Sequence, residues 1–222
     1  MSKLSAVLCL LITATFLHAE SIQDILARMD RDAPKFTGVS ADLQMVTFTA
    51  ILNDKTTENG TLQMQRLGPN NVRAIIDFSK ESDPRVLFFS GKIVRIYYPK
   101  LQTFQDYEVG KNGQALNQYL LLGFGSSGKE LAQSYNITLE GSEKVAETDT
   151  TKLLLIPKDP KVSMRLSKVE MWMPANASTP IQQQFYEPSG NYRKVTYSNI
   201  QMGSPVKGAL ELKLPSGVKK QS

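Results

Sequence analysis

The sequence contains very few residues that carry acid–base, thiol or metal chemistry near neutral pH. Its 222 residues include one cysteine, Cys9, and one histidine, His18. A chain without these residue types has no imidazole base, no thiolate nucleophile, no Ser-His-Asp relay and no Cys/His metal site. Because both residues fall in the leader described next, we expect no catalytic residue, no metal site and no cofactor. A hydrolase built on carboxylates alone, such as Glu143 with Glu147, is the remaining enzymatic alternative.

Long apolar runs are also missing, apart from one at the start. Leu4–Leu17 is almost unbroken, follows Lys3, and leads into small residues up to Ala19. This pattern is typical of a cleavable secretory signal peptide over residues 1–19. The run is shorter than the roughly 20 residues of a transmembrane helix. We therefore expect an exported protein whose residues 20–222 form a single domain.

Basic charge is present without clustering. The chain has 26 Lys and Arg against 21 Asp and Glu, a formal charge of +5. Apart from Lys219 and Lys220 the basic residues are scattered, and no basic stripe with interleaved aromatic residues suggests nucleic acid. We expect a solubilising surface and no nucleic-acid partner, with a weak attraction to anionic membranes or acidic partners left open.

The hydrophobic pattern predicts one helix followed by many strands. Ser21 and Asp24 form a capping-box pattern ahead of apolar residues at helical spacing, and the helix should end near Pro34. From Ser40 onward the period changes to two, with short turns between runs rich in Val, Ile, Thr, Tyr and Phe. So many strands joined by hairpins predict a curled antiparallel sheet with a concave face. A last strand is expected at Leu210–Leu214, followed by a loose tail.

One interior stretch, Gly113–Ser134, lacks this alternation. Its apolar residues predict a short helix that covers the mouth of the concave face, with four lid residues: Leu116, Tyr119, Leu120 and Phe124. The glycine run Gly123–Gly128 that follows satisfies a G-x-G-x-x-G nucleotide fingerprint. Glu130 stands where a P-loop needs a hydroxyl, and no βαβ unit surrounds the run. We therefore interpret the glycines as a flexible hinge beside the lid.

Several strands each carry one apolar face. Their inward residues are predicted to line a lipid-binding cavity: Leu62, Met64, Val72, Ala74, Ile76, Phe78, Val86, Phe88, Val94, Ile96 and Tyr98. The alternative is an ordinary hydrophobic core. Arg66 shares the face of Leu62 and Met64, and is predicted to lie at the rim of the cavity. It could equally be an arginine at a strand end that reaches into water.

Three segments occur in an order that matches a known family. They are Gly60-Thr-Leu-Gln-Met-Gln-Arg66, Ser90-Gly91-Lys92 with the aromatic strand up to Pro99, and Leu212-Lys-Leu-Pro215-Ser-Gly217-Val218. Together they resemble the periplasmic outer-membrane lipoprotein carrier (LolA) family and its broader superfamily, over nearly all of the chain after the leader. Leu67 stands where that family has proline, and Ser90 where it has aspartate.

The resemblance implies a fold, a site and partners. The fold is mainly β with a few helices: a strongly curved antiparallel sheet forms an incomplete β-barrel, closed by an N-terminal helix and a helical lid. The function would be that of a monomeric periplasmic carrier of acylated lipoproteins, loaded by an inner-membrane ABC-type lipoprotein-releasing complex and unloaded to an outer-membrane acceptor. Arg66 matches the arginine that holds the lid of the empty cavity shut. The same fold also serves non-shuttling envelope sensors and carriers of other long-chain lipids.

Overall fold

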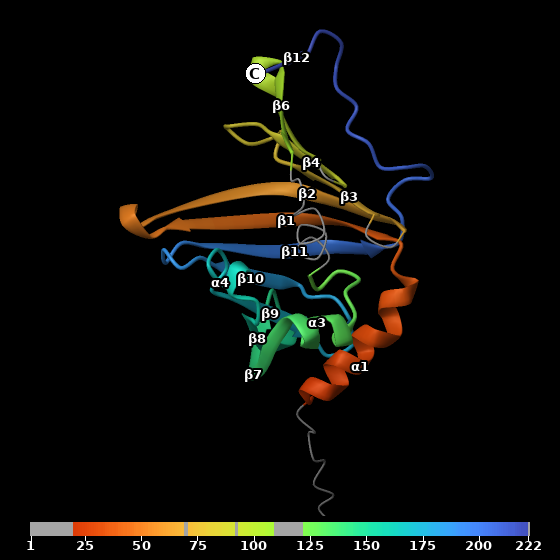
Figure 1. Cartoon of the computed structure of the whole chain (residues 1–222), viewed down its shortest axis with the longest axis vertical. Helices are drawn as coiled ribbons and strands as arrows, with labels where there is room; N and C mark the ends of the chain where they lie inside the picture. Colours follow the sequence, from red (N-terminus) through yellow and green to blue (C-terminus); the bar gives the residue numbers. More distant parts are fainter. Residues whose placement is uncertain (1–19, 69–70, 92, 109–121, 222) are drawn as a thin grey trace, which may run out of the picture.

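The structure, a computed structural model, describes residues 20–68, 71–91, 93–108 and 122–221. Within these ranges twelve strands form one sheet (Figure 1). None of the helices described there has the length and apolar character needed to span a bilayer. The predicted leader, residues 1–19, lies outside the described residues.

Over the described residues the chain order is helix, six strands, helix, two strands, a short helix, three strands and a short final strand. The helices and 3-10 turns are α1 (Ile22–Asp32), η1 (Ala33–Lys35), η2 (Ala50–Leu52), η3 (Pro99–Leu101), α3 (Gly128–Ser134) and α4 (Pro160–Ser163). The first strands are β1 (Gly38–Thr49), β2 (Asp54–Gly68), β3 (Asn71–Asp77), β4 (Val86–Ser90), β5 (Ile93–Tyr98) and β6 (Thr103–Glu108). The others are β7 (Tyr135–Val145), β8 (Thr148–Pro157), β9 (Lys168–Pro174), β10 (Gln182–Tyr186), β11 (Tyr192–Met202) and β12 (Lys219–Lys220).

The sheet is built from two meanders joined side by side. Its order is β12-β6-β5-β4-β3-β2-β1-β11-β10-β9-β8-β7, and every pair is antiparallel except β12 with β6. The long strands β1, β2 and β11 cross the middle of the molecule (Figure 1). The outermost strands β12 and β7 do not pair with each other, so the sheet curves without closing. The predicted fold class, an incomplete barrel with a few helices, is confirmed.

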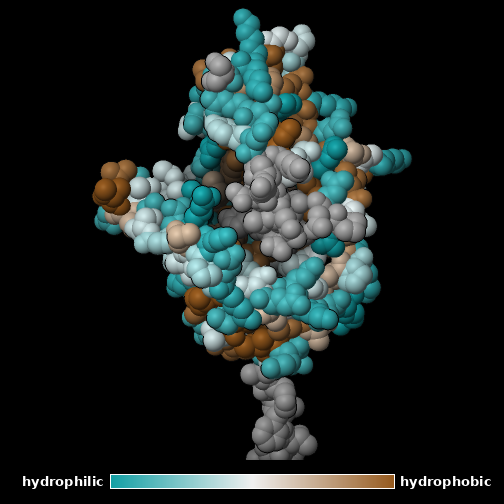
Figure 2. Space-filling model, in the orientation of Figure 1, coloured by the Kyte–Doolittle hydropathy of each residue, from teal (hydrophilic) through white to brown (hydrophobic). Residues whose placement is uncertain are grey.

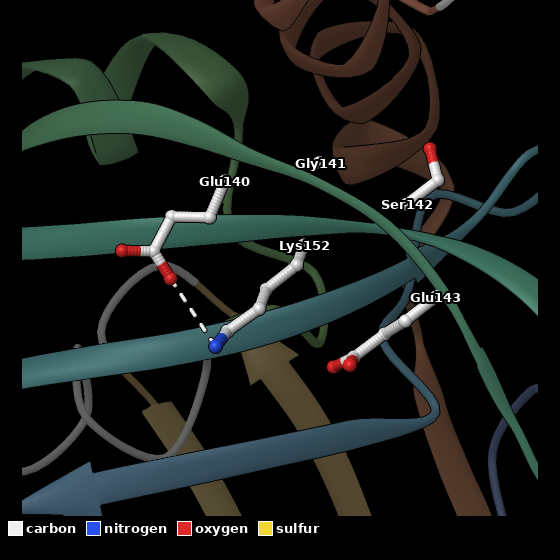
Figure 3. Close-up of a pocket in the computed structure, with 5 residues that line it drawn as sticks. All are labelled: Glu140, Gly141, Ser142, Glu143 and Lys152. Carbon is white, nitrogen blue, oxygen red and sulfur yellow. Dashed lines mark ion pairs between the residues drawn. The ribbon is translucent and has the colours of Figure 1, made fainter.

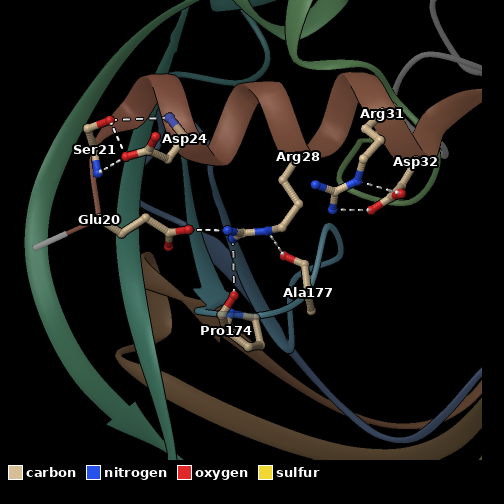
Figure 4. A network of polar contacts seen from close by, with 8 residues as sticks. All are labelled: Glu20, Ser21, Asp24, Arg28, Arg31, Asp32, Pro174 and Ala177. Carbon is tan, nitrogen blue, oxygen red and sulfur yellow. Dashed lines mark hydrogen bonds and ion pairs between the residues drawn. The ribbon is translucent and has the colours of Figure 1, made fainter. Parts of the chain in front are cut away.

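Helix α1 begins with the predicted capping box. The Ser21 hydroxyl accepts from the Asp24 backbone N–H, and the Asp24 carboxylate accepts from the Ser21 backbone N–H. One turn later Arg28 donates to the carbonyl oxygens of Ala177 and Pro174, and it pairs with Glu20 (Figure 4). These bonds fasten α1 to the loop after β9, so the helix is tied to the sheet at its polar side as well as by packing.

The face of the sheet that carries α1 and α3 is called the inner face below. The buried residues Ile25 and Met29 of α1 and Leu131 of α3 pack there against Leu153, Leu155, Val169 and Met171 of β8 and β9. A second buried cluster joins Phe36 and Phe124 to Val39, Met64, Val72 and Ala74 of β1 to β3. A third consists of Leu43, Leu62 and Phe78. The main core thus lies under the two helices, on the C-terminal half of the sheet.

The end of the chain differs from the prediction. Leu210–Leu214 forms no strand, and the expected loose tail instead pairs with β6 through Lys219 and Lys220. On the way, Gln65 holds the segment by donating to the Ser204 hydroxyl and the Gly208 carbonyl and accepting from the Leu210 backbone N–H. The alternation of apolar residues suggested a strand, but the segment crosses the sheet instead of running along it.

Candidate functional site

Strand register brings most of the predicted cavity residues onto one face. Across β2 and β3, Leu62 is opposite Ile76, Met64 opposite Ala74, and Arg66 opposite Val72. Directly opposed residues of antiparallel strands point to the same side. The face continues onto β4 and β5, where it consists of Leu87, Phe89, Val94 and Ile96. The inner face of β2 to β5 is therefore a continuous apolar surface.

Two predicted cavity residues lie on the opposite face. Val86 is opposite Asp77 and Phe88 opposite Ile75, so both point outward with Arg95 and Tyr97. The prediction assigned them inward because Arg85 precedes them. Their neighbours Leu87 and Phe89 are the inner residues that the prediction missed. Since Val86–Phe89 are four apolar residues in a row, alternation within β4 could not reveal its phase.

The inner residues fall into two groups by exposure. Five of them are buried: Leu62, Met64, Val72, Ala74 and Phe78. Their cover includes the side chains of Phe36 and Phe124, which pack on Met64, Val72 and Ala74 and which we call the plug. The others are only half-buried: Ile76, Leu87, Phe89, Val94, Ile96 and Tyr98. A ligand could thus reach one part of the surface directly, and the rest only if the plug moves.

Arg66 lies against the plug. Its guanidinium donates to the carbonyl oxygen of Ala33 at 3.0 Å and to that of Gly125 at 2.5 Å. It also stacks over the Phe36 ring, 5.1 Å from the centroid. Burial lowers the pKa of this guanidinium, and the charge of Glu130 partly opposes that change. One side chain of β2 therefore joins η1 to the loop before α3. The lid residues Leu116, Tyr119 and Leu120 lie outside the described residues.

Close packing and backbone conformation both require glycine on either side of Phe124. A Cβ on Gly125 would lie 2.3 Å from the Phe36 ring, and one on Gly123 would lie 2.7 Å from the Pro180 ring. Both have positive φ, which glycine adopts without strain. Ser127 then caps α3 in a capping box with Glu130. The run is a tightly packed connection that presents Phe124 to the sheet, which accounts for its glycines without a hinge or a nucleotide.

The outer face of the C-terminal half carries a polar cluster instead. Glu170 of β9 is 6% exposed and accepts from Lys168 at 2.8 Å, while Lys152 lies 3.1 Å from it and 3.2 Å from Glu140. Burial alone would raise the pKa of Glu170, but the hydrogen bonds from both lysines outweigh it and lower that pKa. A hollow of about 410 Å³ lies here, lined by Glu140–Glu143 and Lys152 (Figure 3). Its charges are paired, so the cluster is explained as structural.

A second hollow, of about 530 Å³, crosses β11, β1, β2 and β3. Asp42, Gln44, Thr61 and Asp77 line it from the outer face. Among the described residues no group of His, Cys, Asp and Glu side chains could hold a metal ion. The residues that line the two hollows are mainly polar or charged, in contrast to the apolar side chains of the inner face of β2 to β5.

The comparisons with known proteins bear on the fold alone. No protein-family model matches the sequence, and no curated protein matches it. An uncharacterized conserved protein from Thermus thermophilus has a similar structure, with a TM-score of 0.53 and 14% identity over 91% of this chain and 99% of that one. The lipoprotein LppX of Mycobacterium tuberculosis gives 0.47 and 16%, over 84% of this chain and 99% of its own. A LolA superfamily protein from Nitrosomonas europaea gives 0.37 and 15%, over 84% and 95%.

At a TM-score of 0.53, the Thermus thermophilus protein shares its fold with this chain. Membership of the lipoprotein carrier family itself stays a prediction.

Proposed function

We propose that this protein is a periplasmic carrier that shelters acyl chains of lipoproteins on the inner face of its sheet. The observation that carries the proposal is the unequal covering of that face. On β8 and β9 the apolar residues are buried under α1 and α3. On β3 to β5 the residues Ile76, Leu87 and Ile96 stay half-buried. A protein that only needed a core would gain by covering these residues too, since buried apolar area contributes about 25 cal/mol per Å².

The cargo sets a demanding requirement. Each methylene group moved from hydrocarbon to water costs about 0.8 kcal/mol, so a lipoprotein with two or three acyl chains does not cross an aqueous space unaided. A carrier must offer comparable apolar area and still release the load. Met45 and Met64 lie on the inner face, and methionine side chains adapt to ligands of different shape.

Opening would follow from movement of the plug. In the empty protein Phe36 and Phe124 cover Met64, Val72 and Ala74, and Arg66 bonds the segments that carry both rings. Acyl chains would first contact Ile76, Leu87 and Ile96, then displace the rings and extend onto Leu62 and Met64. On release, the Arg66 bonds would form again and favour the closed state.

The partners in this proposal follow from the cargo. An inner-membrane ABC-type complex would supply acylated lipoproteins, and an outer-membrane acceptor would receive them. No reaction is involved, and no cofactor is required. A non-shuttling sensor of the same fold is the alternative, and it differs in holding one stable complex where a carrier turns over.

The test compares two neighbouring residues of β3 on opposite faces. Ile76 is opposite Leu62 and Leu87 on the inner face, whereas Ile75 is opposite Gln63 and Phe88 on the outer face, and both are half-buried. We expect Ile76→Asn to weaken binding of a dansyl-labelled fatty acid about tenfold or more, the loss expected when roughly two methylene contacts disappear. Ile75→Asn should leave the affinity within about twofold.

Mass spectrometry of the protein purified from periplasm identifies the natural ligand. Bound diacylated or triacylated lipoprotein would support the proposal, and free phospholipid or glycolipid would redirect it to another lipid. Equal effects of Ile76→Asn and Ile75→Asn, measured on variants with matched melting temperatures, would show that the inner face is not the binding surface.

A further inference from the structure

The tip of the longest hairpin exposes two large apolar side chains. Ile51 and Leu52 lie in η2, between β1 and β2, and are 92% and 72% exposed. The hairpin projects well beyond the neighbouring strands, and Figure 2 shows apolar residues gathered at its end. Large apolar side chains exposed at a protruding position contribute little to the stability of the folded chain. Their exposure therefore indicates a contact with another molecule or with a membrane.

The tip is held in a fixed shape. The Ala50 backbone N–H donates to the Asn191 side-chain oxygen at 2.9 Å, and Asn53 ends the 3-10 turn in the left-handed region with φ of 48°. The β5–β6 connection repeats this design. There η3 ends at Gln102 with φ of 51° and exposes Leu101 by 63%. Strand directions place both turns at the same end of the sheet.

Aromatic and basic side chains lie directly behind the apolar tip. Phe48 stacks on Tyr192 with ring centroids 5.0 Å apart, and Tyr192 contacts Tyr186 at 5.7 Å. Lys55 lies 5.9 Å above the Phe48 ring. Lys168 lies 4.2 Å above the Tyr186 ring. From the tip inward the order is thus aliphatic side chains, then one row that carries both aromatic rings and lysines, since Lys55 lies opposite Phe48 and Lys168 opposite Tyr186.

That order matches a lipid interface. Aliphatic side chains enter the acyl region, aromatic rings favour the headgroup level, and lysines remain at the surface, where they meet anionic lipids. A protein partner would not require a row of aromatic and basic side chains behind the aliphatic tip. Glu187 is paired with Arg193 at 3.2 Å and Lys168 with Glu170 at 2.8 Å, whereas Lys55, which follows Asp54 in the sequence, has its ammonium over the Phe48 ring.

We infer that the β1–β2 hairpin is a membrane-contact site that inserts Ile51 and Leu52 into the surface of a phospholipid bilayer. The contact is reversible and shallow, because two aliphatic side chains give far less affinity than an acyl anchor. It would bring the protein to the membrane with its strand ends facing the lipid. The inference is independent of acyl carriage, since it uses the outer end of the hairpin and not the inner face.

Flotation of the empty full-length protein with vesicles tests the contact. Vesicles of phosphatidylethanolamine and phosphatidylglycerol should carry the wild type upward, and Ile51→Ser with Leu52→Ser should reduce the bound fraction about tenfold. Leu67→Ser with Met202→Ser is the matched control, because these exposed residues, 40% and 54%, lie at the opposite ends of β2 and β11. The control should bind like the wild type.

An Ile51→Trp variant gives a second readout, because the one native tryptophan, Trp172, is buried and 4% exposed. Its emission should shift to shorter wavelength when the same vesicles are added. Equal flotation of the tip variant and the wild type, or no shift in the tryptophan emission, would overturn the inference. Binding of the tip to a membrane protein but not to protein-free vesicles would overturn it as well.

Discussion

Arg66 occupies a position that packing alone does not explain. It lies on an apolar face, where a charged side chain costs free energy unless its donors are satisfied. Two carbonyl oxygens, from Ala33 and Gly125, satisfy it, and they belong to the two segments that carry Phe36 and Phe124. The same bonds exist only while both segments lie against β2. The residue therefore favours the closed arrangement over any open one.

Replacing Arg66 by leucine should slow the release of an acyl ligand. Hydrogen bonds from a charged donor contribute about 1.5–3 kcal/mol each, and partial exposure places these at the lower end. Without them the closed, empty state is less stable while the loaded state is unchanged. We expect loading to persist and the release rate of a dansyl-labelled fatty acid to fall about tenfold, as measured by stopped-flow displacement.

Arg85→Leu serves as the control for that experiment. Arg85 also lies over a phenylalanine ring, 4.8 Å from the centroid of Phe78, but it pairs with Glu58 and contacts neither segment of the plug. Its replacement should leave release unchanged. If Arg66→Leu released ligand as fast as the wild type, the arginine would be an ordinary strand-end residue.

At the scale of residues, prediction succeeded where alternation was clear. The polar–apolar alternation of β2 and β3 placed Leu62, Met64 and Val72 on one face, and the register agrees. It failed on β4, where Val86–Phe89 are all apolar and the phase depends on the turn before the strand. The carbonyl partners of Arg66 also could not be predicted individually, because backbone atoms carry no sequence signal.

Among the elements, the contact between α1 and α3 depends on a single missing side chain. A Cβ on Gly128 would lie 2.3 Å from the carbonyl oxygen of Leu26 and 2.6 Å from its Cα. Both are backbone atoms, so they cannot move aside as a flexible side chain could. The close approach allows Leu131 to reach the same buried cluster as Ile25 and Met29.

Gly128→Ala should therefore destabilise the fold. Overpacking a close contact costs about 1–3 kcal/mol, and here the helices must separate to accept the methyl group. Urea unfolding followed by circular dichroism measures the loss. Gly208→Ala is the control, since no atom lies within 4 Å of the Cβ it would add, and its free energy of unfolding should change by about 0.5 kcal/mol or less. Equal stability of the two variants would contradict this account.

Prediction of elements worked best for those with strong local signals. The capping box at Ser21 and the two hairpin meanders are present as the sequence indicates. The polar stretch Asp54–Asn59 lacks the apolar alternation typical of a strand, yet it extends β2 by pairing with β1. Backbone hydrogen bonds to β1 hold this stretch in the sheet. Because the hairpin is exposed to solvent here, the polarity of its side chains says little about strand formation.

At the scale of the whole molecule, the two ends of the sheet, at β7 and at β6, are protected from pairing with another chain in different ways. The β7 edge is interrupted by a register shift between Leu139 and Gly141 and carries Glu140, Glu143 and Lys144, features that oppose pairing with another chain. The β6 edge is covered by the end of the chain. There the backbone N–H groups of Lys219 and Gln221 donate to the carbonyl oxygens of Gln102 and Phe104 at 3.0 and 2.8 Å.

Deleting residues 219–222 should therefore make the protein self-associate. The deletion frees the carbonyl oxygens of Gln102 and Phe104, and it also removes the side-chain bonds in which Gln221 donates to Thr103 and accepts from Gln105. An uncovered edge strand pairs readily with a second copy. Light scattering after size exclusion should show a larger mass that grows with concentration, while the full chain remains the expected monomer. Lys219→Ala with Lys220→Ala keeps the backbone pairing and should also stay monomeric. If it associated as strongly as the deletion, lysine charge and not strand coverage would protect this edge.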